Sequence, residues 1–338
     1  MEEFGKKVIN LYNSLVDIGE NMNSEISYRI KVTPNFQQSG PVVFGGFPWY
    51  YRLVTRGSGI YVSKEGSFFF SVAPSWNTEK NTFLDDKYII IRPEVHANSI
   101  SDFIDFSKLL SKSLNTPIVL KQVTKHLFHT LLEYGFRSYS ESECWDQYSK
   151  FDDQTYPEIV LRTDHYVSAN YARGSIKDQV NANEYYIEES DLSKIDQRES
   201  VKEEIFRVFY DWLRVFLKRF PNAINKNFVS WNLLTFDAMI SDELMTLLSI
   251  KNKTGKTIGI FSLIKTSSYQ FDVVFSFISE FAGNFQRVAY DMLISWIQKN
   301  YNQCIYLNLG GSELKSLYEF KKSIGSCEEL ETYHLVLS

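Results

Sequence analysis

The chain has 338 residues, of which 44% are hydrophobic and 23% are charged, and its formal net charge is −5. These values are typical of a globular protein, suggest about two domains, and exclude collagen-like, low-complexity and disordered chains. The acidic balance also disfavours a general nucleic-acid binder, which usually carries a basic face, so we expect no DNA partner.

The cysteines and the apolar runs bear on where the protein works. Cys144, Cys304 and Cys327 show no CxxC spacing, which is typical of reduced thiols in the cytosol. The first residues, MEEFGKKVINLYNSL, contain no apolar core of a signal peptide. No apolar run approaches the roughly 20 residues that a membrane span requires. We therefore expect a cytoplasmic protein without a membrane span.

The first half of the chain alternates helical and strand-like patterns. Apolar residues on one face predict a helix over 1–22, and short β-branched and aromatic segments predict several strands between 28 and 91. Helices are then predicted over 101–114 and 124–135, and strands over 117–123 and 157–163. Together these elements indicate a first α/β unit.

An acidic stretch follows this unit. Residues 178–204 contain nine acidic and three basic side chains, a pattern typical of a solvated connection or the exposed start of a helix. The next segment, 205–220, has apolar side chains at i, i+3 and i+4 and stops at Pro221, which predicts an amphipathic core helix. We therefore expect domains at 1–177 and 205–338, joined by an acidic connection at 178–204.

The second half repeats the α/β theme. Its patterns follow the order β-β-β-α-β-α-β. Strands are predicted over 243–255, 256–265, 269–279, 303–310 and 331–338, and helices over 285–300 and 312–325. The similarity of this order to that of the first half suggests a structural duplication.

The segment FISEFAGNFQRVAYDMLISWI is the first candidate site. A strand ends near Glu280, a turn that contains Gly283 follows, and a helix begins near Phe285. Such a turn offers free backbone N–H groups and the positive end of the helix dipole to an anion. Arg287, in the first helical turn, would add charge-assisted hydrogen bonds to a phosphate. The alternative is that Gly283 belongs to an ordinary turn that binds no anion.

The segment CIYLNLGGSELKSLYEFKKSIG is the second candidate site. Asn308 ends a strand, Gly310–Gly311 permit backbone conformations closed to other residues, and Ser312 is expected to cap the next helix. Tyr318 lies about two turns further on. An ordinary connection accounts for the glycines, but less well for a gathering of Asn308, Ser312 and Tyr318 at one strand end.

The string NLGGSELKSLYEFKKSIG resembles the ending of Fem-type peptidoglycan aminoacyltransferases and of the C-terminal domain of phosphatidylglycerol lysyltransferases. More broadly, residues 225–338 resemble a GNAT-type acyltransferase domain. The resemblance implies an α/β (α+β) fold with two GNAT-like units, each a mixed, largely antiparallel twisted sheet flanked by helices. It also implies an enzyme that moves an acyl or aminoacyl group to an amine acceptor, either a small molecule or a peptide.

The same resemblance implies roles for individual residues. Five residues match the turn that cradles the phosphates of coenzyme A: Gly283, Asn284, Gln286, Arg287 and Val288. Tyr318 matches a tyrosine that protonates the leaving thiolate. In GNAT-like chemistry a base deprotonates the acceptor amine, and Glu280 is the best-placed carboxylate for this step. Asn308 and Ser312 are expected to position the donor or the acceptor.

Two donors and one rival function are open at this point. An acyl-CoA such as acetyl-CoA is one donor. Aminoacyl-tRNA is the other, and it is disfavoured because residues 251–338 carry nine basic and eight acidic side chains. The segment AGNFQRVAY has one glycine where the usual cradle has two, which favours the alternative of a catalytically inactive GNAT-fold module that binds a small ligand or peptide. His126 and His129 have no evident carboxylate or cysteine partner, so we expect no metal.

Overall fold

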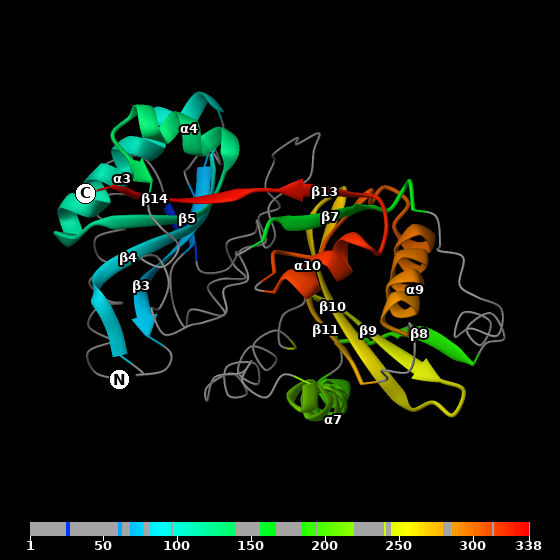
Figure 1. Ribbon diagram of the computed structural model, residues 1–338. Helices are drawn as coiled ribbons and strands as arrows, with labels where there is room; N and C mark the ends of the chain where they lie inside the picture. Colours follow the sequence, from blue (N-terminus) through cyan, green and yellow to red (C-terminus); the bar gives the residue numbers. More distant parts are fainter. Residues whose placement is uncertain are drawn as a thin grey trace. The chain divides into compact units, whose positions relative to one another are not determined.

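The computed structural model describes residues 25–27, 60–62, 68–77, 82–95, 97–138, 156–166, 184–192, 195–219, 240, 245–279, 285–312 and 314–337. The chain divides into two compact units, Met1–Pro157 with Leu330–Ser338, and Glu158–Glu329. Each unit is built on a seven-stranded sheet (Figure 1). No helix within the described ranges is both long enough and apolar enough to cross a membrane.

The first sheet has the strand order β1-β2-β3-β4-β5-β14-β6. Its strands are β1 (Glu25–Ser27), β2 (Ile60–Val62), β3 (Phe68–Asn77), β4 (Thr82–Val95), β5 (Ile118–Thr124), β14 (Thr332–Leu337) and β6 (Arg137–Ser138). All neighbours are antiparallel except β4 and β5, which run parallel from Tyr88↔Ile118 to Ile91↔Lys121. The helix predicted over 1–22 lies outside the described residues.

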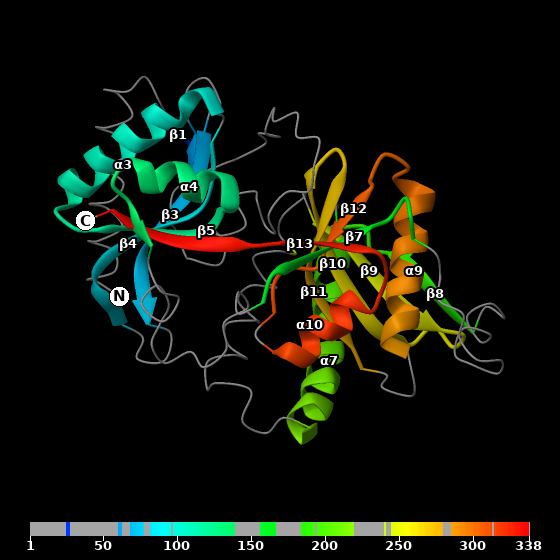
Figure 2. The same ribbon diagram turned by 45° about the horizontal axis from the view of Figure 1, so that its top comes forward.

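Two amphipathic helices cover one face of the first sheet. The short 3₁₀ helix η1 (Ala97–Ser99) leads into α3 (Ile100–Leu114), and α4 (Lys125–Glu133) follows β5; Figure 2 shows both helices beside β5. Their core comprises Phe103, Ile104, Phe106, Leu110, Leu127 and Leu131 together with Ile118, Leu120, Val123, Phe136, Leu335 and Leu337. The C-cap of α3, Asn115, lies in the left-handed region (φ 48°), which an asparagine tolerates better than most residues.

The second sheet has the strand order β13-β7-β12-β11-β10-β9-β8. Its strands are β13 (Cys327–Leu330), β7 (Glu158–Arg162), β12 (Tyr306–Asn308), β11 (Gln270–Ile278), β10 (Thr257–Ser267), β9 (Met245–Asn252) and β8 (Tyr185–Glu189). β11 and β12 run parallel, whereas β7–β12, β10–β11, β9–β10 and β8–β9 are antiparallel pairs. The predicted β-β-β-α-β-α order of this half is therefore observed.

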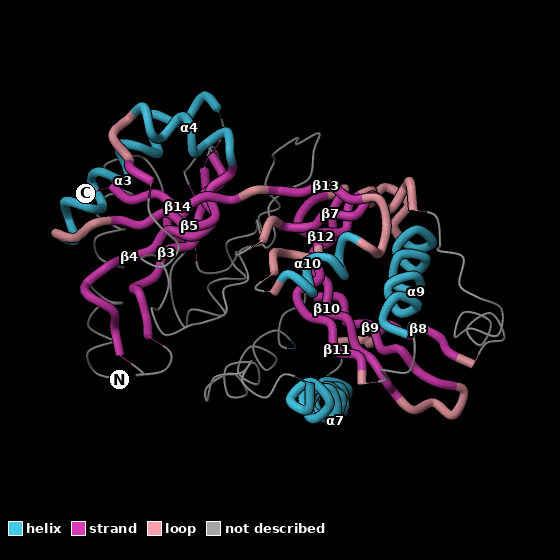
Figure 3. Tube along the Cα trace, viewed as in Figure 1, coloured by secondary structure: helices cyan, strands magenta, loops and turns pink. Residues whose placement is uncertain are grey.

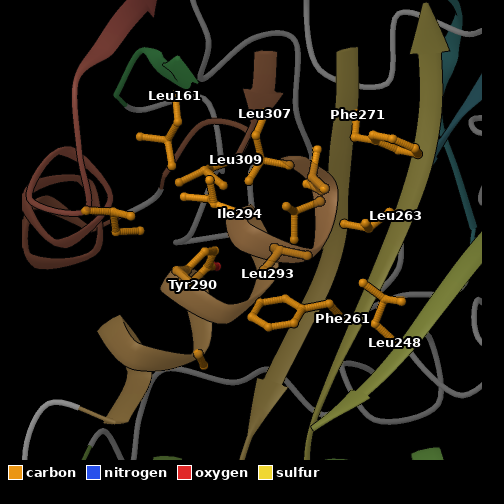
Figure 4. Packing of buried hydrophobic residues seen from close by; sticks show 14 of the residues in the cluster. Leu161, Leu248, Phe261, Leu263, Phe271, Tyr290, Leu293, Ile294, Leu307 and Leu309 are labelled. Atoms are coloured by element: carbon orange, nitrogen blue, oxygen red, sulfur yellow. The ribbon is translucent and has the colours of Figure 1, made fainter. Parts of the chain in front are cut away.

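Helices cover both faces of the second sheet. Successive residues of a strand point to opposite faces, and apolar residues on both faces each pack against a helix. Along β10, Phe261 and Leu263 join the core beneath α9 (Phe285–Asn300), whereas Ile260 joins the core beneath α7 (Ile195–Arg219). Figure 4 shows the first core, in which Tyr290 and Leu293 of α9 meet the strands. Figure 3 shows α7 and α9 on different sides of the strands β9 to β11.

The chain exchanges one strand between its two sheets. β7 follows β6 in the sequence, yet it lies between β12 and β13 in the second sheet. β14 follows β13, yet it pairs with β5 and β6 in the first sheet. The strand that ends the first half of the sequence, β7, therefore completes the second sheet, and the strand that ends the second half, β14, completes the first sheet.

The fold class predicted from the sequence is confirmed: the chain has an α/β fold with two largely antiparallel sheets flanked by helices. For the acidic residues 178–204 the sequence left open a solvated connection or the exposed start of a helix. Where the structure describes them, they form β8 and the first turns of α7, both within the second unit. Pairing of Glu188 and Glu189 with β9 explains why an acidic segment becomes an edge strand.

Candidate functional site

The site is built where the two parallel strands of the second sheet separate. β11 and β12 pair only from Gln270↔Tyr306 to Asp272↔Asn308, and β11 then continues to Ile278. A register shift against β10, between Ser262 and Leu263, adds one extra residue to β11 immediately after this point. Such a bulge bends a strand and ends regular pairing. β12 ends at Asn308. Within the described residues, the backbone after Asn308 therefore does not pair with β11.

Asn308 is held in one orientation by two hydrogen bonds. Its Nδ2 donates to Oε2 of Glu158 at 3.0 Å, and the backbone N–H of Gly310 donates to its Oδ1 at 2.8 Å. Leu307 and Leu309 belong to the core beneath α9, so Asn308 points to the opposite face of the sheet. Asn308 and Glu158 are both fully buried, and a buried amide with both ends bonded is rigid.

Asp272 lies beside Asn308 on the same face of the sheet. It is fully buried, and its Oδ1 accepts hydrogen bonds from Nε2 of Gln270 at 2.7 Å and from Oγ1 of Thr266 at 3.1 Å. Asn308 is therefore flanked by two buried carboxylates, Asp272 on one neighbouring strand and Glu158 on the other. Asp272 therefore faces the protein interior rather than solvent.

Lys321 brings a buried positive charge to the end of β12. It lies on α10 (Lys315–Lys322), and its Nζ donates to the backbone carbonyl of Gly310 at 3.2 Å and to that of Gly311. A lysine is rarely buried to this extent, with only 8% of its surface exposed. Sequence reasoning missed it, although its spacing was a signal. Leu317, Phe320, Lys321 and Ile324 follow the i, i+3, i+4, i+7 pattern, which puts a lysine on the apolar face of the helix.

Ser312 follows the two glycines and is fully buried. Its hydroxyl has no hydrogen-bond partner in the described part of the chain. α10 begins at Lys315 with Leu314 as its N-cap and no side-chain cap bond, so the prediction that Ser312 caps this helix is wrong. Leu314 is extended, with φ −119° and ψ 137°, so the cap lies two residues after Ser312. An unpaired buried hydroxyl costs about 1–3 kcal/mol, so it indicates a position for a ligand or a water molecule.

Tyr318 lies on α10 and takes part in a charged triad with Lys322 and Glu329. Its hydroxyl donates to Oε2 of Glu329 at 2.6 Å, and Nζ of Lys322 donates to the Tyr318 oxygen at 3.3 Å and to Oε1 of Glu329 at 2.6 Å. Because the Glu329 carboxylate holds the phenolic proton, the pKa of Tyr318 is raised. Hydrogen bonding to Lys322 lowers the pKa of Glu329. Tyr318 is therefore protonated at neutral pH.

The expected phosphate cradle is described only in part. Gln286, Arg287 and Val288 lie in the first turn of α9, where Val288 is buried and the other two are half-buried. Glu280 and the cradle residues Gly283 and Asn284 lie outside the described residues. Among the described residues, no group of three or more His, Cys, Asp or Glu side chains could hold a metal ion.

No family model matches the chain. No curated protein matches its sequence. The similarity is found among solved structures. A conserved protein of unknown function from Bacteroides thetaiotaomicron superposes with a TM-score of 0.65 at 10% identity, over 93% of this chain and 100% of that one.

Two further structures are similar over nearly the whole length. L-PGS from Bacillus licheniformis gives a TM-score of 0.59 at 11% identity, over 96% of this chain and 90% of that one. FemX gives 0.54 at 13% identity, again over 96% and 90%. At these identities the likeness concerns the fold. With the paired sheets and the separated parallel strands, it shows that this chain has the tandem GNAT-like fold.

Proposed function

We propose that the protein transfers an acyl or aminoacyl group from a donor to an amine acceptor, and that the second unit binds the donor. The separation of β11 from β12 at Asp272↔Asn308 carries this proposal. A donor carbonyl placed there would meet the orphan hydroxyl of Ser312 and the buried charge of Lys321. Preorganised donors at a site where negative charge develops are the main source of catalysis in acyl transfer.

The chemistry assigns a role to each group. The acceptor nitrogen attacks the donor carbonyl, and the oxygen of the tetrahedral intermediate takes up negative charge next to Lys321 and Ser312. Glu280 accepts the proton that the amine loses. Tyr318, which is protonated at neutral pH, donates a proton to the leaving thiolate or ribose oxygen. The rigid amide of Asn308 fixes the backbone at Gly310 against which the donor lies.

Two donors fit this scheme. In an acyl-CoA such as acetyl-CoA, the backbone over 283–288 with Arg287 would hold the phosphates. In an aminoacyl-tRNA, the ester at the terminal ribose would occupy the same place, and this donor is included because the sequence resembles Fem-type aminoacyltransferases. Cys304 and Cys327 are free thiols, which agrees with a reducing cytoplasm as the place of reaction.

Donor binding is the direct test of this proposal. We expect one donor class among acetyl-CoA, longer acyl-CoAs and aminoacyl-tRNA to raise the melting temperature, since a ligand at 100 times its Kd stabilises by about 2.7 kcal/mol. The variant Ser312→Ala is expected to weaken that donor about tenfold, because it removes a buried hydrogen-bonding group. No stabilisation by any of these donors would contradict the proposal.

The role of Tyr318 has a matched control within the chain. Tyr333 also donates its hydroxyl to a carboxylate, Oε2 of Glu331, at 2.7 Å. We expect Tyr318→Phe to lower the rate of transfer about 10²–10⁴-fold without changing donor affinity, as for loss of a general acid, whereas Tyr333→Phe leaves the rate unchanged. If donor binds but no amine is acylated by the unmodified chain, the rival function of an inactive binding module is supported instead.

A further inference from the structure

The exchanged strand β7 brings an acidic side chain from the first half of the sequence to the end of β12. Glu158 is the first residue of β7, and its partner Asn308, the last residue of β12, lies 150 residues away in the sequence. Both side chains are fully buried. Glutamate is almost never fully buried unless it is paired, and here the strand exchange makes the pair possible.

The carboxyl group of Glu158 determines which way the amide of Asn308 points. A carboxylate accepts hydrogen bonds and donates none, whereas an amide has one donating end and one accepting end. Nδ2 of Asn308 therefore faces Glu158, and Oδ1 faces the backbone N–H of Gly310. The reversed amide would set oxygen against oxygen and N–H against N–H. Glu158 thus selects the one orientation of Asn308 that holds Gly310.

Gly310 has a backbone conformation that differs from that of a strand. Its φ is 69°, in the left-handed region that a glycine adopts at little cost. Its carbonyl accepts hydrogen bonds from the backbone N–H of Ile159 at 3.3 Å and from Nζ of Lys321 at 3.2 Å. Two successive residues of β7 therefore fix Gly310, because Glu158 acts on its N–H through Asn308 and Ile159 binds its carbonyl.

The position of Gly310 bears directly on Ser312. Ser312 lies two residues further along the chain, and its buried hydroxyl has no hydrogen-bond partner in the described part of the chain. Over such a short distance a shift of Gly310 would also displace this hydroxyl. In catalysis a displacement of about 1 Å can lower the rate about 10²-fold. The groups that fix Gly310 are therefore expected to affect how a donor meets Ser312.

We propose that Glu158 is a positioning residue of the donor site. It acts through Asn308 and Gly310 on the place of the Ser312 hydroxyl and does not itself contact the donor. This inference rests on the proposed function, because it concerns the site at which the donor binds. It gives the exchanged strand β7 a role in function in addition to its place in the sheet.

An exchange of side-chain types between the two positions tests this role. Glu158→Gln keeps the volume, but a glutamine can donate as well as accept, so it no longer selects one orientation of Asn308. Asn308→Asp sets two carboxylates against each other. In the double variant the glutamine donates to the aspartate, whose second oxygen accepts from Gly310, so both hydrogen bonds return. Glu158→Gln gives the measurement even if Asn308→Asp alone does not fold.

The amide of Gly310 reports on the first step without a donor. Leu309–Gly310 is the only Leu–Gly pair in the sequence, so ¹³C-carbonyl leucine with ¹⁵N-glycine isolates its signal in the full chain. We expect its exchange with solvent to quicken about tenfold in each single variant and to return to within about threefold of the original rate in the double variant. Unchanged exchange in both single variants would overturn the proposal, whether or not a donor binds.

Donor affinity tests the second step. Acetyl-CoA, longer acyl-CoAs and aminoacyl-tRNA are titrated separately. For the one that binds, we expect Kd to rise about tenfold in each single variant and to recover to within about threefold in the double variant. Leu248→Ala is the control, with unchanged Kd, because it leaves a cavity in β9, which neighbours neither β7 nor β12 in the sheet.

The outcomes separate this inference from the proposed function. If the unmodified chain binds a donor and both single variants bind it equally well, the positioning role is overturned and the proposed function stands. A double variant as weak as the single ones would also overturn the role, because a structural loss is not rescued by restored hydrogen bonds. If the unmodified chain binds none of the donors, the proposed function fails and the positioning role fails with it.

Discussion

At the scale of single residues, the informative positions are polar side chains that occupy core positions. Glu158 and Asn308 are fully buried and bonded to each other, and Lys321 is bonded to two backbone carbonyls. Burial of such groups costs free energy unless each one finds a partner. Sequence reasoning selected Asn308 and Ser312 because they follow a strand and flank two glycines. It missed Glu158, because the hydrogen-bond partner that allows this carboxylate to be buried, Asn308, lies 150 residues away in the sequence. It also missed Lys321, although the position of this lysine on the apolar face of its helix was a local signal.

His334 also predicts how stability depends on pH. The unfolded chain binds a proton on this histidine near pH 6.5, whereas the folded chain does so only near pH 3. Between these values the unfolded state holds more protons, so this residue destabilises the fold increasingly as the pH falls. Above pH 7 both states are neutral and the residue has no such effect.

The corresponding experiment compares the unmodified chain with His334→Gln by urea denaturation. From pH 8 to pH 5 we expect the unmodified chain to lose about 2 kcal/mol of unfolding free energy more than the variant, because about 1.5 pH units separate pH 5 from the unfolded pKa. The use of a difference cancels the titration of all other groups that the two proteins share. A difference that stays constant with pH would contradict the assigned pKa.

At the scale of elements, hydrophobic periodicity was the reliable signal. The helices predicted over 101–114, 124–135 and 285–300 match α3, α4 and α9 within a few residues. The helix predicted over 205–220 is observed as α7, but it starts ten residues earlier, within the acidic stretch. The extra turns are polar, and a polar helical turn next to an amphipathic helix has no apolar periodicity that would reveal it.

α7 packs on the second sheet through one apolar stripe. Truncation of the central residue of this stripe tests how much that packing contributes to the free energy of unfolding. Phe209 is fully buried and meets Phe277 of β11 edge to face, with 5.0 Å between ring centroids. We expect Phe209→Ala to lower the free energy of unfolding by about 3–5 kcal/mol, since it leaves a cavity in the core. Tyr210→Ala changes the next residue, which is exposed, and is expected to cost less than about 1 kcal/mol. Urea denaturation of both variants gives the comparison; equal losses would show that α7 does not pack as described.

At the scale of the whole molecule, the exchanged strands join sequence-distant segments into each sheet. Residues 332–337 complete the sheet that begins at residue 25, and residues 158–162 complete the sheet that ends at residue 330. Short-range pairing alone would place each strand next to its neighbour in sequence. The exchange therefore makes the last residues of the chain a structural part of its first unit.

Hydrogen exchange can follow each unit separately. Leu335→Asp places a charge in a fully buried position of β14, and we expect a loss of more than about 3 kcal/mol, with protection lost first in β5, α3 and α4. Ile159→Asp in β7 is expected to act first on β12 and α9. Tyr333→Phe in β14 keeps the aromatic ring and serves as the control. If Leu335→Asp first exposes amides of 158–329 instead, the assignment of β14 to the first unit is wrong.

The sequence by itself determined the two-part α/β architecture, most helices and the GNAT-like resemblance, and it proposed the region around Asn308 and Ser312 as a candidate site. These follow from the periodicity of apolar residues, from the positions of glycines and from the order of the elements. Each of these signals can be recognised within a short segment of the sequence. Only the tertiary structure decided the exchange of β7 and β14, and the burial of Glu158, Lys321, Lys121 and His334. These features depend on contacts between residues far apart in the sequence. At these positions, burial and hydrogen bonding contribute more to the free energy of folding than local propensity does.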